Sequence, residues 1–253
     1  MREGLAQHLE ALRWALLRSL VVLILAALVL YWFSEQVLEF LAAPVGHLYF
    51  FTPPEAFWAK LKLSMLAAAV LTAPYVISEV WFFVAPGLKP REKRWGLPGV
   101  LFAVVMFYAG CALALFGAVP IGVKFLASFG GEAMSPFFGA SSYINFVALM
   151  VLSFGVLFET PVVMMVLTGI GLMNPSAVAK KRSYVIVAAF AVAAVVTPTV
   201  DFITQIALAL PLILLFEMGL LLSRMVLFFK NRPAKKNKRG KKKKKRGKNG
   251  KGD

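Results

Sequence analysis

Long runs of apolar residues, separated by short polar segments, dominate the chain from residue 16 to residue 222. A run of roughly 18 apolar residues is enough to cross the hydrocarbon core of a bilayer as a helix. In lipid, a helix is also the one single-segment structure that satisfies its own backbone hydrogen bonds. The pattern therefore predicts an all-α, polytopic membrane protein with six spans, at residues 16–33, 61–84, 97–119, 143–173, 184–196 and 202–222.

The last two spans are expected to be short. A helix over residues 184–196 measures about 20 Å, against a hydrocarbon core of about 30 Å, so the bilayer must thin there or a partner must cover the helix. Pro211 interrupts the sixth span and predicts a kink. Extension of the fifth span by flanking residues such as Lys181 and Thr197 is the alternative, in which nothing special follows.

The segments outside the spans are also patterned. Residues 1–14 place leucines three and four apart on one face, which predicts a short amphipathic helix lying in the membrane interface. Residues 34–59 contain three prolines and several aromatic residues, which favours an external cap of short helices at headgroup depth.

Basic residues sort to one side of the predicted spans. Of the 28 lysines and arginines, 25 lie in the N-terminal segment, the loops after spans 2 and 4, and the residues from 224 onward. The alternate loops hold only Lys60, Lys62 and Lys124. Because cytoplasmic loops carry the excess of Lys and Arg, we expect both termini in the cytoplasm.

Composition divides the chain into two parts. With 253 residues and 60% hydrophobic content, residues 1–223 fit one membrane domain and leave no room for a soluble catalytic domain. The net charge of +16 comes mostly from residues 224–253, a basic tail without the apolar residues needed for folding, so we expect disorder there. We expect this tail to bind anionic lipid rather than nucleic acid; contact with ribosomal RNA is the alternative.

Nothing in the sequence predicts an enzyme, a metal site or a cofactor. His8 and His47 are the only histidines and fall on opposite sides of the membrane in the predicted topology, and no phosphate-binding loop of the GxxxxGK[ST] type is present. Cys111 is the only cysteine, which excludes an intrachain disulfide and suggests packing. Energy for moving any cargo must come from a gradient or a partner.

Three acidic residues fall within the predicted spans. Glu159 lies well away from either end of its span, where an isolated charge costs several kcal/mol unless it faces a partner or water. A protonated, hydrogen-bonded Glu159 with a structural role is the alternative. Glu79 and Glu217 lie near the cytoplasmic ends of spans 2 and 6 and are expected to reach the interface or to pair with a nearby base.

Several segments together resemble the TatC family, the multispanning receptor subunit of the twin-arginine protein translocase. The resemblance runs to about residue 224. It rests on HLEALR (8–13), FFTPPEAF (50–57), FVAPGLKPREKR (83–94), FGVLFETP (154–161), KKRSYVIV (180–187) and TPTVDFITQ (197–205).

The resemblance implies a site at the cytoplasmic face. The family binds signal peptides that carry paired arginines before an apolar stretch, and it exports their cargo folded. Glu92 then corresponds to the carboxylate that recognises the arginines, since guanidinium and carboxylate form charge-assisted, often bidentate hydrogen bonds. The residues that the resemblance assigns to this site are Glu92, Glu10, Arg13, Phe83, Pro86 and Arg94.

Two further sets follow from the resemblance. Glu159, Thr197 and Gln205 match a polar cluster where the family docks its single-span TatA and TatB partners. Glu55, Phe57 and Asp201 match positions of the external cap. One departure concerns the N-terminus, where the family usually reads HLxELR: the acid here is Glu10 and the expected position is Ala11, a rotation of about 100° on a helix.

The leading hypothesis is therefore a non-enzymatic receptor and core subunit of the twin-arginine translocase, which lies in a bacterial inner membrane and forms a homo-oligomer within the complex. It binds twin-arginine signals, recruits TatA and TatB, and exports folded proteins at the expense of the proton-motive force. A proton- or ion-coupled solute transporter that uses Glu159 is one alternative. A ribosome-associated membrane insertase, suggested by the basic tail, is the other.

Overall fold

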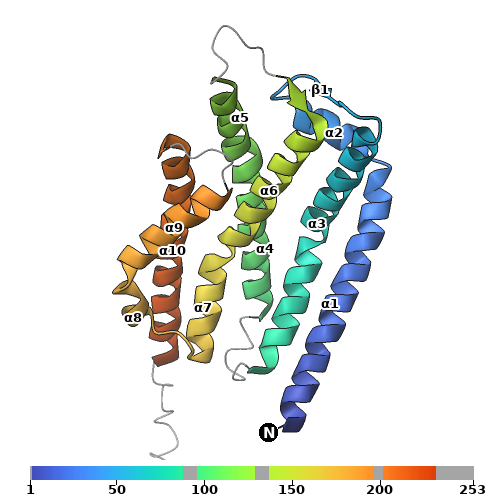
Figure 1. Ribbon diagram of the computed structural model, residues 1–253. Helices are drawn as coiled ribbons and strands as arrows, with labels where there is room; N and C mark the ends of the chain where they lie inside the picture. The colour runs from blue at the N-terminus through green and yellow to red at the C-terminus, as the bar shows by residue number, and fades with distance from the viewer. Residues whose placement is uncertain (1, 88–95, 129–136, 197–201, 232–253) are drawn as a thin grey trace, which may run out of the picture.

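The computed structural model describes residues 2–87, 96–128, 137–196 and 202–231, which form a bundle of long helices (Figure 1). The helices that build the bundle are α1 (Arg2–Tyr31), α3 (Glu55–Val84), α4 (Gly96–Leu113), α5 (Val119–Ser128), α6 (Ala140–Phe158), α7 (Thr160–Ile170), α9 (Arg182–Val196) and α10 (Phe202–Asn231). Shorter elements connect them: α2 (Ser34–Ala42), β1 (Leu48–Tyr49), the 3-10 turn η1 (Ala85–Gly87), the π-helix η3 (Ala114–Ala118), β2 (Phe138–Gly139) and α8 (Pro175–Ala179).

The bundle is built to cross a membrane. Among the described residues, five helical stretches are long and apolar enough to do so, and α9 is a sixth, shorter apolar helix. Large apolar side chains face outward along these stretches, for example Leu28 at 64% and Leu101 at 64% exposed, as expected where lipid replaces water. The 15 residues of α9 measure about 22 Å. The prediction of six membrane helices with a short fifth is confirmed.

The first helix differs from the expectation. Residues 2–31 form one continuous helix of 30 residues, so the predicted interfacial helix over 1–14 is not a separate element. No glycine or proline occurs between Leu5 and Tyr31, and once a helix is nucleated each added residue gains a backbone hydrogen bond. The change from an amphipathic to an apolar pattern marks a change of surroundings, not the end of a helix.

The sixth span is not short. The helix α10 has 30 residues and continues to Asn231, past the expected end at 222 and past the domain boundary placed between 223 and 224. Residues 223–231 contain neither glycine nor proline, so falling hydropathy there does not end the helix. The rest of the predicted tail, residues 232–253, lies outside the described residues.

The fourth span is broken at Glu159. Pro161 has no N–H to donate to the carbonyl of Leu157, and this ends α6 and begins α7. The Thr160 hydroxyl donates to the Leu157 carbonyl at 2.6 Å in its place. The break therefore leaves that carbonyl satisfied while it changes the path of the helix.

A second proline interrupts α3. Pro74 cannot donate to the carbonyl of Val70, four residues earlier. The Tyr108 hydroxyl, from α4, donates to that carbonyl at 3.1 Å. We call residues 75–84, which follow this point, the terminal segment of α3.

The core lies between α3, α4 and α6. Leu63, Ile144 and Val147 are at most 1% exposed, and Cys111 is buried among packed side chains as expected. Helices α4 and α6 approach closely at Gly110, where an added Cβ would lie 2.5 Å from the carbonyl oxygen of Phe154. A glycine is thus required at this crossing.

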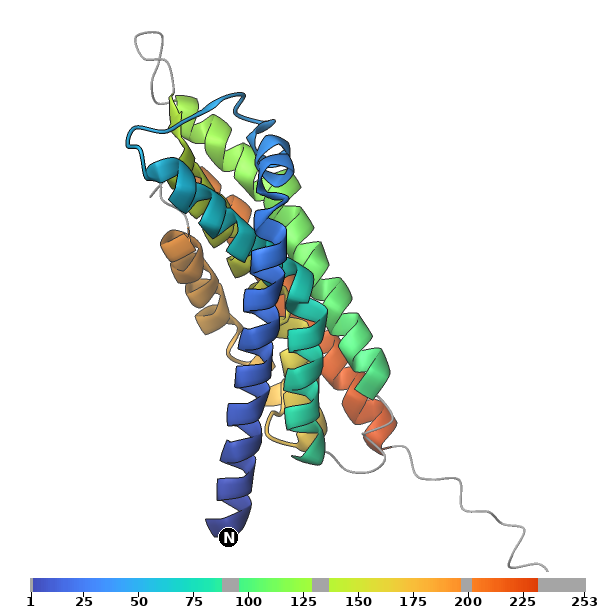
Figure 2. The same cartoon turned by 90° about the vertical axis from the view of Figure 1, so that its right-hand side faces the viewer.

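The two ends of the bundle differ. At the cap end, α2 and the strands cover the helices; β1 and β2 pair in parallel, and the buried Tyr143 hydroxyl donates to the Leu41 carbonyl of α2 at 2.6 Å. At the other end, which we call the N-terminal end, α1 begins and α3, α7 and α10 finish (Figure 1). The two views agree that α1 lies at the edge of the bundle beside α3 (Figure 2).

Candidate functional site

The loop that the resemblance singles out leaves α3 at the N-terminal end. Its first residues are described: Phe83 is half-buried in the last turn of α3, and Pro86 is exposed in η1. Glu92 and Arg94 lie outside the described residues. The geometry of the site is therefore defined by what surrounds the two ends of this loop.

The N-terminal helix packs against the start of the loop. The ring of His8, in α1, stacks on the ring of Phe83, with centroids 4.2 Å apart and planes inclined by 20°. His8 and Phe83 are far apart in the sequence and belong to two of the segments that carry the resemblance. The stack brings these two segments together at one end of the bundle.

The other end of the loop is packed against the same part of α3. Gly96, the first residue of α4, is buried, and a Cβ added there would lie 2.9 Å from Nε1 of Trp81. Gly99 lies one turn further along, 3.7 Å from the same ring by the same measure. Glycine at position 96 thus allows the Trp81 indole to lie directly against the start of α4.

Two charged residues in the segment 8–13 of α1 face outward. Glu10 and Arg13 are both exposed. Because successive residues on a helix are about 100° apart, Glu10 points about 200° away from His8, which faces α3. Ala11, the position where the family carries its acid, lies closer to the α3 side. Glu10 therefore lies close to His8 along the helix axis but on the opposite face of α1.

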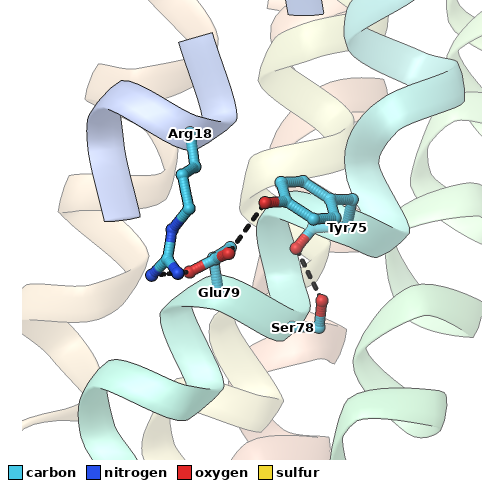
Figure 3. Close-up of polar contacts among 4 residues, drawn as sticks. All are labelled: Arg18, Tyr75, Ser78 and Glu79. Carbon is cyan, nitrogen blue, oxygen red and sulfur yellow. Dashed lines mark hydrogen bonds and ion pairs between the residues drawn. The ribbon is translucent and has the colours of Figure 1, made fainter. Parts of the chain in front are cut away.

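An ion pair joins α1 to the terminal segment of α3 further into the bundle (Figure 3). A guanidinium nitrogen of Arg18 lies 3.0 Å from Oε2 of Glu79, and the Tyr75 hydroxyl donates to Oε1 of Glu79 at 2.8 Å. The Ser78 hydroxyl donates to the Tyr75 carbonyl at 2.7 Å. Glu79 therefore pairs with a nearby base, as predicted.

Glu217 does the same on the other side of the bundle. Arg182, the first residue of α9, lies 2.8 Å from a carboxylate oxygen of Glu217 in α10. Both partners are more than a third exposed, so the pair contributes little to stability. The second prediction of acid–base pairing is thereby confirmed.

The predicted partner-binding cluster is only partly described. Glu159 lies at the junction of α6 and α7, and its Oε1 atom is buried without a hydrogen-bond partner among the described residues. Gln205, in α10, donates to the Phe190 carbonyl of α9 at 3.0 Å. Thr197 lies outside the described residues. Gln205 therefore ties α10 to α9, and Glu159 offers a free acceptor at a break in a membrane helix.

Glu55 organises the cap end. Its carboxylate accepts hydrogen bonds from the backbone N–H of Phe51 at 2.8 Å and of Ser141 at 3.2 Å. These residues follow β1 and β2, so one side chain ties together the ends of both strands. Phe57 is exposed and meets the edge of Tyr31, with centroids 6.4 Å apart. Asp201 lies outside the described residues.

An ion pair also lies in the cap. Lys60 donates a hydrogen bond to Glu35, at the start of α2. This hydrogen bond, with the positive charge of Lys60, lowers the pKa of the Glu35 carboxyl below its ordinary value.

No group of three or more potential metal ligands occurs in the part of the chain that the structure describes.

Sequence reasoning did not identify His8, Trp81 or Arg18 as parts of this region. The signal was present for Arg18, a base within an apolar helix, and for Gly96, a glycine at a predicted helix start. His8 lies in the HLEALR segment that carries the resemblance, but nothing in the sequence indicated its contact with Phe83, and for Trp81 there was no signal, because both contacts join segments distant in the chain.

Comparison of the chain with known proteins identifies its family. The family model described as Sec-independent protein translocase protein (TatC) matches residues 7–211. The chain belongs to the TatC family. Curated TatC proteins from Carboxydothermus hydrogenoformans and Escherichia coli are 33% and 34% identical, over 88% of this chain in both cases and 93% and 88% of their own lengths. A solved structure named "Crystal Structure of Twin Arginine Translocase Receptor- TatC" matches with a TM-score of 0.77 and 32% identity, covering 87% of this chain and 99% of that one.

Membership in the TatC family settles the broad class. The protein is a multi-pass membrane component of a Sec-independent protein translocase, a transport subunit and not an enzyme. The helical architecture predicted from hydropathy agrees with the solved TatC structure. The residues of the N-terminal end described above are thus features of a TatC protein.

Proposed function

We propose that this TatC protein is the receptor subunit of a twin-arginine translocase and that it captures signal peptides at the N-terminal end of the bundle. In this proposal Glu92 is the main acceptor for the paired arginines, Glu10 is the secondary acceptor, and Phe83, Pro86, Arg13 and Arg94 shape the site around them. The His8–Phe83 stack carries the proposal, because it brings α1 against Phe83 in the last turn of α3, from which the chain continues toward Glu92. A carboxylate at the edge of a low-dielectric membrane binds guanidinium more strongly than one in water.

The proposed topology places this end in the cytoplasm. Lys and Arg are concentrated in the segments at the N-terminal end, and Arg2 and Asn231, the described ends of the chain, both lie there. The positive-inside rule then orients the protein with both termini inside a bacterial inner membrane. Signal peptides emerging in the cytoplasm reach the site directly from that side.

We further propose that single-span TatA and TatB helices dock along α9 and α10, near Glu159, Thr197 and Gln205. Two observations support this: α9 is too short to cross the bilayer alone, and Oε1 of Glu159 lacks a partner among the described residues. A polar group on a partner helix would satisfy it, a contact of roughly 1 kcal/mol in membranes. Export would then occur in an oligomeric complex driven by the proton-motive force, with residues 232–253 on anionic lipid.

The test is photo-crosslinking to signal peptides with Arg-Arg or Lys-Lys. A crosslinker at position 92 should capture the Arg-Arg peptide and little of the Lys-Lys peptide, and position 10 should capture it more weakly. Because a hydrogen bond to a charged group contributes roughly 1.5–3 kcal/mol, Glu92→Gln should lower peptide binding by about tenfold or more.

The matched control is Glu39→Gln, which removes an exposed acid of α2 at the cap end and should leave binding unchanged. Equal capture of both peptides, or undiminished binding in Glu92→Gln, would refute the assignment of Glu92. Absence of crosslinks from position 10 alone would remove Glu10 from the site.

A further inference from the structure

The position of the α1 N-terminus depends on one interface. Among the described elements, α1 packs extensively on α3 alone, and both views show it at the edge of the bundle (Figures 1 and 2). Lipid tails are as apolar as leucine side chains, so helices in a membrane are not driven together by the hydrophobic effect, and close packing and interhelical polar contacts determine how they fit. Specific contacts must therefore determine where residues 8–13 lie relative to the loop after α3.

Two specific contacts connect the helices near the site. One is the His8–Phe83 stack, and the other is the Arg18–Glu79 ion pair. Glu79 and Phe83 are four residues apart, so they lie on the same face of α3. The Arg18 side chain extends toward the N-terminus of its helix, as side chains in helices do, and so reaches Glu79 one turn above the stack.

The Glu79 carboxylate of this ion pair is held from two sides, while the Arg18 side chain is 58% exposed. Both carboxylate oxygens of Glu79 are engaged, one by Arg18 and the other by Tyr75, and the Glu79 side chain is only 12% exposed. Tyr75 immediately follows Pro74, where the backbone hydrogen bonding of α3 is interrupted. Figure 3 shows these groups converging between the two helices. The network thus acts on α3 at the point where the terminal segment begins.

We propose that Arg18, Glu79 and Tyr75 are positioning residues, which set the register of α1 against the terminal segment of α3 and thereby place the α1 N-terminus beside the signal-binding loop. This inference rests on the proposed function of that loop. The network itself does not contact the peptide. Its role is to keep two parts of one site, far apart in sequence, at a fixed spacing.

The register is measured without any peptide. In a Cys111→Ala background, the rate at which cysteines replacing His8 and Phe83 form a disulfide under mild oxidation reports how often positions 8 and 83 approach each other, since the native rings are in contact there. Arg18→Gln or Glu79→Gln should each lower the initial rate of disulfide formation by about tenfold. The double exchange of Arg18→Glu with Glu79→Arg should restore it, and Arg182→Gln, which breaks the Arg182–Glu217 pair, should leave it unchanged.

Peptide binding is measured in the same variants with His8 and Phe83 intact. Arg18→Gln and Glu79→Gln should lower binding of the Arg-Arg peptide to a similar extent, about tenfold, and the double exchange should restore it. Wild-type disulfide rates in both single variants would overturn the proposal. Loss of binding in Glu79→Gln but not in Arg18→Gln would also overturn it, since Glu79 would then be a direct ligand of the peptide.

The two proposals fail in different ways. If the wild-type protein binds Arg-Arg and Lys-Lys peptides equally, the receptor proposal for Glu92 fails, while the disulfide rates still decide whether the network sets the register. Conversely, Glu92→Gln should lower peptide binding by about tenfold or more without changing those rates. If the double exchange restores the disulfide rate and peptide binding, loss of the ion pair and not a general loss of folding explains the single variants. The double exchange alters the same two residues but keeps opposite charges at them.

Discussion

Tyr108 and Pro74 act on the same backbone carbonyl, which predicts a thermodynamic coupling between two helices. Pro74 has no N–H to donate to the carbonyl of Val70, and the Tyr108 hydroxyl donates to it instead at 3.1 Å. Tyr108→Phe removes this donor and leaves the carbonyl unsatisfied. Pro74→Ala restores the N–H at position 74, which can then donate within the helix.

The expected magnitude follows from the membrane setting. Side-chain hydrogen bonds in membrane proteins contribute about 0.6 kcal/mol on average and about 1.7 at most, and an acceptor left without a partner in hydrocarbon adds to the loss. We therefore expect Tyr108→Phe to lower the free energy of unfolding by about 1 kcal/mol. In the Pro74→Ala background the same substitution should cost close to nothing, so the coupling energy is also about 1 kcal/mol.

Reversible unfolding of the wild type, the two single variants and the double variant in mixed micelles measures this coupling. Tyr143→Phe provides the control, because its hydroxyl donates to Leu41 at the cap end and not to Val70. Tyr143→Phe should lower the free energy of unfolding by the same amount whether residue 74 is proline or alanine. If Tyr108→Phe costs equally in both backgrounds, the carbonyl of Val70 is not what links these residues, and the account of the α3 interruption is wrong.

Two further predictions concern packing and pH. Gly110→Ala should lower the free energy of unfolding by about 2 kcal/mol, because the added Cβ would lie 2.5 Å from the Phe154 carbonyl oxygen and must push the helices apart. In the same assay Gly169→Ala, whose added Cβ meets no atom within 4 Å, should be neutral or slightly stabilising. Equal effects of the two substitutions on the free energy of unfolding would contradict the close crossing of α4 and α6. The Glu35 carboxyl has a lowered pKa, so its contribution to stability is present above its ordinary value of 4.5 and is lost as pH falls through the lower folded value. Thermal unfolding followed from about pH 6 to pH 3 should show this loss, and Lys60→Gln should reduce it; an unchanged profile in that variant would exclude Lys60 as the cause.

Hydropathy predicted the membrane helices well but not their ends. The runs are long and apolar because lipid demands it, so their existence was readable from the sequence. Helix ends depend on local hydrogen bonding instead. At Glu159 the break follows from Pro161, whose effect on Leu157 was visible in the sequence but not used, whereas α10 continues past residue 222 because nothing there prevents it.

The candidate site was predictable only in its parts. The resemblance identified the loop from Phe83 onward and the N-terminal segment, and the presence of a base near Glu79 suggested pairing. That His8 stacks on Phe83 depends on the register between two helices, which no local pattern encodes. Glu92, Arg94, Thr197 and Asp201 lie outside the described residues and stay predictions.

The terminal segment of α3 is the common reference for both sides of the site. Glu79 and Phe83 contact α1, while Trp81 packs on the start of α4. On a helix, residue 81 points about 200° away from residue 79, so the segment meets the two neighbours on opposite faces. A rotation of this segment must therefore change its contacts with α1 and its contact with α4 at the same time.

This arrangement gives Pro74 a role beyond a local kink. Because it interrupts the hydrogen bonding of α3 just before Tyr75, the terminal segment can take a direction of its own while the first part of α3 stays packed in the core around Leu63. The direction is then determined by contacts within the N-terminal end and by the Tyr108 hydroxyl. A substitution at Pro74 should consequently alter the His8–Phe83 spacing and the Trp81–Gly96 contact at once, whereas one near Leu28, far along α1 from the site, should alter neither.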